Sequence, residues 1–483
     1  MKNLTKVLSG LMALSMLALT ACGSSSTPSS SGGNDTPKAT DAPKSAADPA
    51  ASEGKVLKIY AWNTEFQSRF NDYFKSLPSD VEVEWVITPS DDNAYQNKLD
   101  ADLPSNDGSD NPIDIFLIEA DYATKYIDTE YALDVKGDIG LTDADLKDQY
   151  KYTQEIVTSS DGKLKGTTWQ ATPGLFAYRR SIAKDVLGTD DPVEVQKSLS
   201  DWDKFDATAA KMDGKGYKML SGYDDAFRTF SNNKSAAWVD ASGNLSVDAN
   251  MLRWVDQTKT YTDKGYNNKT RLWAPEWQAD QGPSGKVFGF FYSTWGINFT
   301  LLGNSLATPV PEGLSKASDP DGYAKFVTGN GAYGDYAVCE GPESYYWGGT
   351  WICAAKGTDN ATLIADVMRT LTCDSATMKQ ITLDTEDYTN NLTAMNEIAN
   401  DPTYGSAFLG GQNHIALFNA SAGKIDMSTI SKYDQGCTES FQDAFNDYYN
   451  GDVDKKTALS NFFTAIVEMY PNLKTPNVDD VIK

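Results

Sequence analysis

The pattern of apolar and polar residues after residue 54 predicts a strand followed by a helix. Residues 55–62 read KVLKIYAW, and their side chains alternate between two faces, as in a strand. Phe66, Phe70 and Phe74 follow at intervals of four, which is the spacing of one face of an amphipathic helix. Pro78 is expected to end this helix, because proline lacks the backbone N–H that a helix needs.

The same alternation continues with two more strands and one more helix. Strands are predicted over 81–87 and 113–118, with a helix over 92–103 between them. This order of elements predicts an α/β fold with a doubly wound sheet, in which ligands bind beyond the carboxyl ends of the strands. The polar and aromatic residues at these ends are Trp62, Asn63, Glu119 and Asp121.

The rest of the chain repeats both patterns less regularly. Further strands are predicted over 174–178, 285–292 and 348–355. Ser200 is expected to cap a helix that begins near Trp202, by the logic of a capping box. Other helices are predicted over 360–373 and through most of the last fifty residues.

The first 22 residues have the pattern of an export signal. Two lysines precede the segment 7–21, which carries no charge and is too short to span a bilayer comfortably. The segment ends in Leu-Thr-Ala-Cys22-Gly, which matches the bacterial lipobox. That match implies a signal peptide over 1–21, cleavage before Cys22, and a lipid such as palmitate on Cys22.

A tether is predicted to follow the lipobox cysteine, over 22–54. From residue 23 to residue 54 the chain has no aromatic, Leu, Ile, Val or Met side chain. Such a segment buries too little apolar surface to offset its ordering entropy. No second apolar run of membrane-spanning length follows, so the lipid is expected to be the only attachment to the membrane.

Charge and composition exclude several classes of function. The chain has 483 residues, which suggests two or three folding units. It carries 42 Lys and Arg against 67 Asp and Glu, a net charge of −25, so binding to nucleic acid or to an anionic membrane surface is not expected. His414 is the only histidine, which disfavours histidine-based catalysis and metal ligation, and it is expected in a loop or at the surface.

The other cysteines and the catalytic motifs point to no redox, metal or cofactor chemistry. The cysteines after the lipobox are Cys339, Cys353, Cys373 and Cys437. They form no CxxC motif; free thiols are favoured over disulfides, but three pairings stay open. No nucleophile elbow, zinc-protease motif or P-loop occurs. No metal and no cofactor is therefore expected.

Several short motifs occur in an order that resembles a known family. They are Ala61-Trp62-Asn63, 114–121, 169–178, Trp202-Asp203, Trp295-Gly296 and 346–351. Together with the lipobox and the tether, this succession resembles the extracellular solute-binding lipoproteins of bacterial carbohydrate ABC importers, the group that includes maltose-binding protein. The resemblance extends from about residue 55 to the C-terminus, and the loop 409–413 is a feature whose role it leaves open.

The resemblance implies two doubly wound α/β lobes joined by a hinge, as in type II periplasmic binding proteins. Lobe one would comprise 55–168 and 346–425, and lobe two would comprise 169–345 and 426–483. The chain would cross between the lobes near 166–173, 340–347 and 424–430. A sugar would bind in the cleft between the lobes, which would close on it.

Sugar recognition requires aromatic rings for the C–H faces and polar groups for the hydroxyls. The candidates for stacking are Trp62, Trp295, Trp347 and Trp351. The candidates for hydroxyl binding are Asn63, Glu65, Asp92, Asp121, Asp225, Arg228 and Gln412. The alternative for each tryptophan is a place in the core, and for each polar residue a helix cap or a surface charge.

The sequence thus favours a monomeric, non-enzymatic binding protein on the outer face of the bacterial cytoplasmic membrane. It would capture an oligosaccharide and present it to the transmembrane subunits of an ABC permease. Two alternatives stay open, a membrane-anchored polysaccharide-degrading enzyme and a glycan-binding adhesin. The enzyme remains an alternative because, among 67 acidic residues, a catalytic carboxylate pair needs no sequence motif.

Overall fold

The structure, a computed structural model, describes residues 54–316 and 318–482. The predicted signal peptide, the lipobox cysteine Cys22 and the tether up to residue 53 lie outside the described residues. The strands are β1 (Val56–Ala61), β2 (Glu82–Ile87), β3 (Ile115–Glu119), β4 (Thr167–Thr168), β5 (Gly174–Arg179), β6 (Gly289–Ser293), β7 (Tyr336–Cys339) and β8 (Thr350–Ala354).

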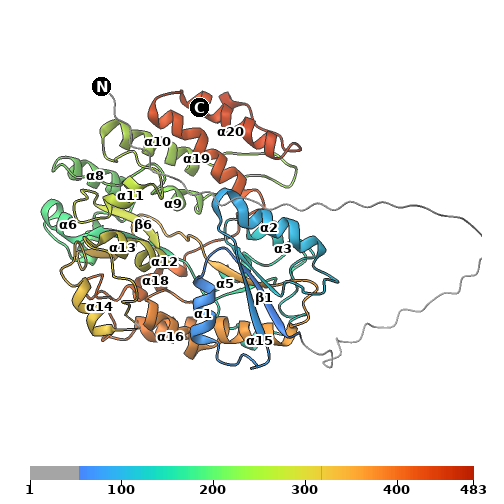
Figure 1. Ribbon diagram of the computed structural model, residues 1–483. Coiled ribbons are helices and arrows are strands. Elements are labelled where there is room, and N and C mark those ends of the chain that lie inside the picture. The colour runs from blue at the N-terminus through green and yellow to red at the C-terminus, as the bar shows by residue number, and fades with distance from the viewer. Residues whose placement is uncertain (1–53, 317, 483) are drawn as a thin grey trace, which may run out of the picture. The chain divides into compact units, whose positions relative to one another are not determined.

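Helices surround these strands (Figure 1). The α-helices are α1 (Glu65–Tyr73), α2 (Ala94–Asp102), α3 (Ala123–Ile127), α4 (Asp143–Leu146), α5 (Lys151–Glu155), α6 (Arg180–Leu187), α7 (Pro192–Lys197), α8 (Trp202–Asp213), α9 (Phe227–Ser231), α10 (Ala249–Lys264), α11 (Pro275–Asp280), α12 (Thr294–Gly296), α13 (Leu302–Ser305), α14 (Pro320–Val327), α15 (Ala361–Met368), α16 (Ser375–Thr385), α17 (Leu392–Ala399), α18 (His414–Ala422), α19 (Asp434–Asn450), α20 (Lys455–Met469) and α21 (Val478–Val481). Short 3-10 turns cover Asp91–Asn93 and Leu103–Ser105, and π-helical turns cover Ile297–Leu301 and Arg369–Cys373.

The first sheet has the strand order β2-β1-β3-β8-β4. β1 runs parallel to β2 and β3, as the strand–helix alternation predicts. β8 returns from late in the chain and pairs antiparallel with β3 and β4. Its residues are buried along its whole length, which is expected of a strand inside a sheet that is covered on both faces.

The second sheet has three strands in the order β6-β5-β7, and all its pairings are antiparallel. The α/β class and the presence of two sheets agree with the expectation, whereas parallel winding does not extend to this second sheet. Phe176 on β5 packs on Phe291 of β6 with ring centroids 4.9 Å apart, so aromatic side chains fill the space beneath the sheet.

Several element boundaries differ from those predicted. α1 ends at Tyr73 because Phe74 adopts an extended conformation, several residues before Pro78. The helix predicted over 92–103 is interrupted at its start, since Asp92 and Asn93 have φ angles of 50° and 59°. Asp201, and not Ser200, caps α8, because its carboxylate accepts a hydrogen bond from the backbone N–H of Lys204.

The cysteines and the histidine are placed as follows. Cys339, Cys353, Cys373 and Cys437 are free thiols. His414 is fully buried at the start of α18, with Nε2 2.9 Å from the carbonyl oxygen of Glu386. The expectation of a loop or surface histidine is therefore wrong, because α18 carries the imidazole into the core. No helix in the described part of the chain combines the length and the apolar character needed to cross a bilayer.

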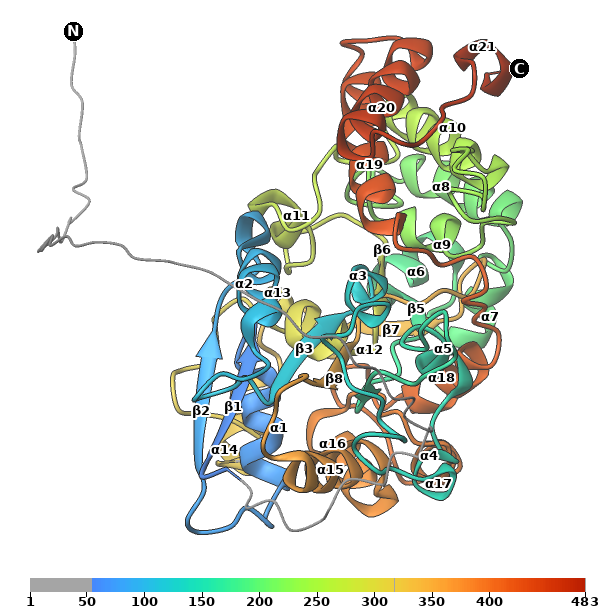
Figure 2. The same cartoon turned by 90° about the vertical axis from the view of Figure 1, so that its right-hand side faces the viewer.

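A group of aromatic side chains packs α10 against the C-terminal helices α19 and α20, which lie side by side in Figures 1 and 2. Trp254 on α10 has no exposed surface and contacts the rings of Phe227 and Phe441, at centroid distances of 4.9 and 5.9 Å. Trp254 therefore packs helix α10 against the C-terminal helix α19.

Substituting Trp254 tests this packing. Trp254→Ala is expected to lower the free energy of unfolding by about 3–5 kcal/mol, because the cavity left by the indole cannot close completely. Denaturant unfolding followed by tryptophan fluorescence measures the change. The control is Phe299→Ala, which removes a side chain that is 77% exposed and should change the free energy of unfolding by less than about 0.5 kcal/mol. Equal midpoints for the two variants would contradict the assignment of Trp254 to the core.

Candidate functional site

A cavity of about 880 Å³ lies where both sheets end. Trp62 and Asn63 follow β1, and Glu119 is the last residue of β3, so the first sheet supplies one wall. Trp295 lies in α12, directly after β6, so the second sheet supplies the other wall. Trp347 lies just before β8 and completes the lining between them.

Tryptophan rings form one wall of this cavity. The rings of Trp295 and Trp347 meet edge to face at 5.3 Å, and Nε1 of Trp295 donates a hydrogen bond of 3.0 Å to the carbonyl oxygen of Trp347. Trp273 stacks on Trp295 at a centroid distance of 6.2 Å and is 44% exposed. The wall thus presents apolar ring surface to whatever enters the cavity.

Backbone conformation holds this wall together at two places. Gly348 has a φ of 74°, and a Cβ there would lie 2.8 Å from Nε1 of Trp295, so only glycine fits beside the indole. Trp273 has a φ of 69°, which is costly for a large side chain. Strain of this kind concentrates at functional sites, where the surrounding structure enforces it.

The opposite wall combines an aromatic group with carboxylates and amides. Trp62 meets the ring of Tyr95 edge-on at 5.5 Å and that of Tyr122 at 6.4 Å. Beside it, Nε2 of Gln170 donates hydrogen bonds to Glu65 (2.9 Å) and Asp387 (3.2 Å). Carboxylates and amides of this kind can bind the hydroxyl groups of a ligand.

The environment of Glu65 disfavours its charged form. Burial raises the pKa of Glu65 to about 7, and the nearby charge of Asp387 adds to this effect. The guanidinium group of Arg69, 3.8 Å from the Glu65 carboxylate, acts in the opposite direction.

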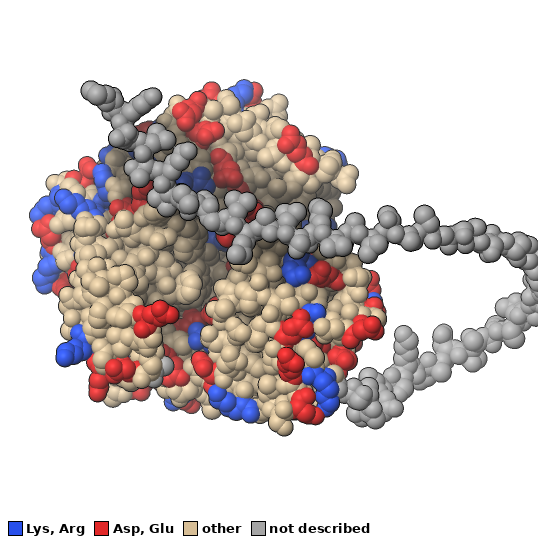
Figure 3. Space-filling view, in the orientation of Figure 1, with Lys and Arg blue, Asp and Glu red and all other residues tan. Residues whose placement is uncertain are grey.

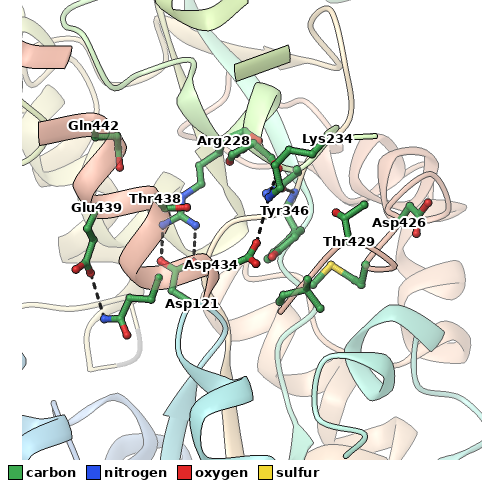
Figure 4. A pocket seen from close by; sticks show the side chains of 15 residues that line it. Asp121, Arg228, Lys234, Tyr346, Asp426, Thr429, Asp434, Thr438, Glu439 and Gln442 are labelled. Atoms are coloured by element: carbon green, nitrogen blue, oxygen red, sulfur yellow. Dashed lines mark hydrogen bonds and ion pairs between the residues drawn. The ribbon is translucent and has the colours of Figure 1, made fainter. Parts of the chain in front are cut away.

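Ion pairs lie beside the cavity (Figure 4). Arg228 donates hydrogen bonds from both terminal nitrogens to the carboxylate of Asp121, and its guanidinium carbon lies 6.0 Å from the Trp347 ring centroid. The backbone N–H of Asp121 donates a 2.7 Å hydrogen bond to Glu119. Burial, together with the charge of Asp121, raises the pKa of Glu119.

Comparison with known proteins supports one family. Residues 68–407, more than half of the chain, match the family described as bacterial extracellular solute-binding protein. The chain belongs to this family of extracellular solute-binding proteins. No functionally curated protein matches the sequence significantly.

Solved structures establish the fold of this solute-binding protein. An extracellular solute-binding protein of family 1 is 16% identical with a TM-score of 0.68, and the match covers 86% of this chain and all of that one. A binding protein of an ABC transporter from B. animalis subsp. lactis Bl-04, in complex with β-1,6-galactobiose, is 15% identical with a TM-score of 0.64, over 88% and 100% of the chains.

A third similar structure is the galacto-N-biose/lacto-N-biose I-binding protein of the ABC transporter from Bifidobacterium longum. It is 14% identical with a TM-score of 0.63, and the match covers 88% of this chain and all of that one. The fold of the solute-binding protein is therefore that of the type II periplasmic binding proteins.

The cavity of the solute-binding protein contains most of the residues proposed from its sequence. The lining includes Trp62, Asn63, Glu65, Asp121, Trp295 and Trp347. Arg228 lies beside it, in the adjoining pocket that Figure 4 shows, and reaches it through Asp121.

Besides Arg228, four proposed residues do not line the cavity. Asp225 is buried and accepts hydrogen bonds from the backbone N–H groups of Ser221 and Gly222 and from Nε1 of Trp277. Its acceptor positions are used inside the protein, and burial raises its pKa to about 6. Asp92 is exposed, and its neighbour Asn93 occupies the lining position instead.

The other two residues outside the lining are held by strands. Trp351 lies within β8, is 3% exposed, and donates a hydrogen bond from Nε1 to the carbonyl oxygen of Thr153. Gln412 pairs its side-chain amide with both backbone groups of Val338, at 2.9 and 2.8 Å. The loop 409–413 therefore extends the edge of β7 instead of contacting the cavity.

Sequence reasoning missed several residues that line the cavity. The main ones are Tyr95, Tyr122, Gln170, Trp273, Asp387 and Glu439. Trp273 follows no strand, and its only local signal is Pro275 at the start of α11, which marks a loop before a helix. Asp387 is brought to the cavity by packing alone, since more than 200 residues separate it from its partner Gln170.

The raised pKa of Glu65 makes a prediction about stability and pH. A group that binds its proton more tightly in the folded state contributes stability below its ordinary pKa of 4.5, and this contribution is lost as the pH rises to about 7. Glu65→Gln removes this titration. As the pH rises from 4.5 to about 7, the melting temperature of the variant should therefore rise relative to that of the wild type. Scanning calorimetry at both ends of the window measures the gain, with the exposed Glu312→Gln as control. A constant difference between wild type and Glu65→Gln would contradict the prediction.

Proposed function

We propose that this solute-binding protein captures a neutral oligosaccharide in the 880 Å³ cavity and delivers it to the transmembrane subunits of an ABC importer. The observation that carries the proposal is the wall of Trp273, Trp295 and Trp347, which faces carboxylates and amides across one cavity. Rings cover the C–H faces of a sugar, and carboxylates bind hydroxyls through charge-assisted hydrogen bonds.

The comparisons support the same class of ligand. The similar solved structures include transporter binding proteins in complex with β-1,6-galactobiose, lacto-N-biose and cycloalternan. The protein acts without turnover of the sugar, as a monomer. A chain with a net charge of −25 has no general attraction for acidic glycans, which agrees with a neutral ligand. On the face shown in Figure 3, acidic side chains occur both at the edges and further inside, with broad uncharged areas between them.

The two lobes of this protein are proposed as 55–168 with 346–425, and 169–345 with 426–483. The strands of the first sheet fall in the first set and those of the second sheet in the second, which supports this division. Ser421 donates a hydrogen bond to the carbonyl oxygen of Gly174 on β5, and Gln412 pairs with β7. Residues 412–421 of the first set thus also contact strands of the second set, close to the proposed third crossing near 424–430.

The protein is proposed to act at the outer face of the cytoplasmic membrane, attached by a lipid on Cys22. The lipobox and the apolar composition of 7–21 support this attachment. The extracellular location agrees with the family to which the chain belongs.

Calorimetric titration with soluble oligosaccharides tests the function. Trp295→Ala should weaken binding by about 2–4 kcal/mol, because a central aromatic anchor is lost, which is roughly 30- to 1,000-fold in Kd. The ligand-free melting temperature should stay within a few degrees of wild type. Trp85→Ala is the matched control, since Trp85 is a partly buried tryptophan on β2 outside the cavity lining.

Two outcomes would contradict this function. Release of reducing ends from the bound glycan would show an enzyme. Normal sugar binding by Trp295→Ala, together with a much lower melting temperature, would make Trp295 a core residue.

The anchor is tested by Cys22→Ser. Without the thiol no acyl group can be attached, so the variant should appear in the culture medium while the wild type stays with the membrane fraction. Immunoblots of the two fractions measure the distribution. Retention of the variant in the membrane fraction would overturn the lipid anchor.

A further inference from the structure

A second cavity, of about 700 Å³, continues the first one. It lies between the helices α2 and α3 on one side and the ends of α19 and α20 on the other. The residues that line both cavities are Asn93, Gln96, Asp121, Tyr122, Gln435 and Glu439. Because the same side chains face both spaces, a long ligand can extend from one into the other.

The second cavity has aromatic surface of its own. Tyr433 and Tyr470 line it, with ring centroids 5.1 Å apart and ring planes at 90°. Both rings are partly exposed, and Met469 beside them is 49% exposed. Both tyrosines pack against the core on one side, and the ring surface that stays exposed toward the cavity is available to a ligand.

A glycine on α19 makes room for this tyrosine pair. A Cβ on Gly436 would lie 2.5 Å from the hydroxyl oxygen of Tyr470 and 2.5 Å from the sulfur of Met469. Glycine inside a helix costs roughly 0.5–1 kcal/mol relative to alanine. Glycine is therefore found at position 436 because a larger residue there would displace Tyr470 from the cavity wall.

Polar groups at the junction of the cavities are also held in a special conformation. Asp92 and Asn93 are consecutive left-handed residues, with φ of 50° and 59°, and Asn93 lines both cavities. Asn93 occupies the N-cap position of α2, but its side chain makes no capping hydrogen bond. Its amide is therefore free to bind a ligand that passes from one cavity to the other.

We propose that the second cavity is an extension subsite that binds the further units of an oligosaccharide whose first units occupy the tryptophan-lined cavity. Tyr433 and Tyr470 form its stacking surface, and Asn93 binds the sugar at the junction. Each cavity alone has the volume of a typical small-ligand pocket, roughly 300–1,000 Å³. The ligand is therefore longer than a disaccharide. This inference rests on the proposed function and concerns the same site.

Chain-length dependence tests the subsite. The probes are maltose to maltohexaose and the β-1,6-linked galactose oligomers of the same lengths, each titrated by calorimetry into the wild-type protein. In the series that binds, Kd should fall at least about tenfold from the disaccharide to the tetrasaccharide, as expected when a second aromatic anchor is engaged.

Variants locate the effect in the tyrosine pair. Tyr433→Ala and Tyr470→Ala, made separately, should raise the Kd of the tetrasaccharide about tenfold and leave that of the disaccharide within about twofold. Tyr448→Ala is the matched control, because Tyr448 lies on the same helix, α19, and packs on Phe445 and Tyr449 outside both cavities. It should change neither Kd.

The outcomes separate this proposal from the function on which it rests. Equal affinity for disaccharide and tetrasaccharide, or equal losses for both in the tyrosine variants, would overturn the extension subsite and leave sugar binding intact. If neither series binds, the result contradicts the proposed function, and therefore also the extension subsite that rests on it.

Discussion

The return of the chain into the first sheet through β8 is the constraint on which the cavity depends. β8 pairs antiparallel with β3, and the register places Thr350 opposite Glu119. The N-terminal end of β8 therefore lies at the carboxyl end of β3. The residues before β8, Trp347 to Gly349, must then reach the edge where Trp62 follows β1. A parallel β8 would place these residues at the opposite edge of the sheet.

The tryptophan wall follows from that register because its members hold one another. Trp347 offers its carbonyl oxygen to the indole N–H of Trp295, which comes from the end of a strand in the other sheet. Gly348 leaves the space that this contact requires. Arg228 lies against the same tryptophan and pairs with Asp121 beyond β3. The contact between the sheets is thus also the lining of the cavity, so a change in the relative position of the sheets would change the site.

Buried ionisable groups concentrate at the same place. Lys234 pairs with Asp434 at 3.1 Å close to the pair of Arg228 with Asp121, and each pair joins segments more than 100 residues apart (Figure 4). Buried pairs of this kind add modest net stability, but removing one partner leaves an uncompensated charge. They act chiefly by specifying how the distant segments meet. Glu119 and Asp387 also line the cavity, and within the described residues their carboxyl groups accept hydrogen bonds from amide groups.

Local sequence patterns were sufficient for much of the first sheet and for part of the site. The strand at 55–62, the apolar strand before Glu119 and the strand before Trp295 are all present, because alternation and apolar runs are properties of neighbouring residues. Trp62, Glu119 and Trp295 could therefore be placed at strand ends before any contact was known. Trp351 was correctly expected within the strand 348–355, but only the packing of the sheet shows that its indole lies in the protein interior, where it is 3% exposed and bound to Thr153.

Only the tertiary structure decided which residues that are distant along the chain contact each other. The antiparallel second sheet, the stacking of Trp273 on Trp295 and the joining of Gln170 to Asp387 depend on long-range packing, which leaves no local periodicity in the sequence. The contact of Gln412 could not be predicted for the same reason, since its amide binds the backbone of Val338 in β7, more than 70 residues away. The sequence by itself determined which segments form strands and helices, because backbone geometry repeats at fixed short intervals. Which side chains meet in the cavity was decided by the register and packing of those segments, because these contacts join residues whose separation along the chain follows no rule.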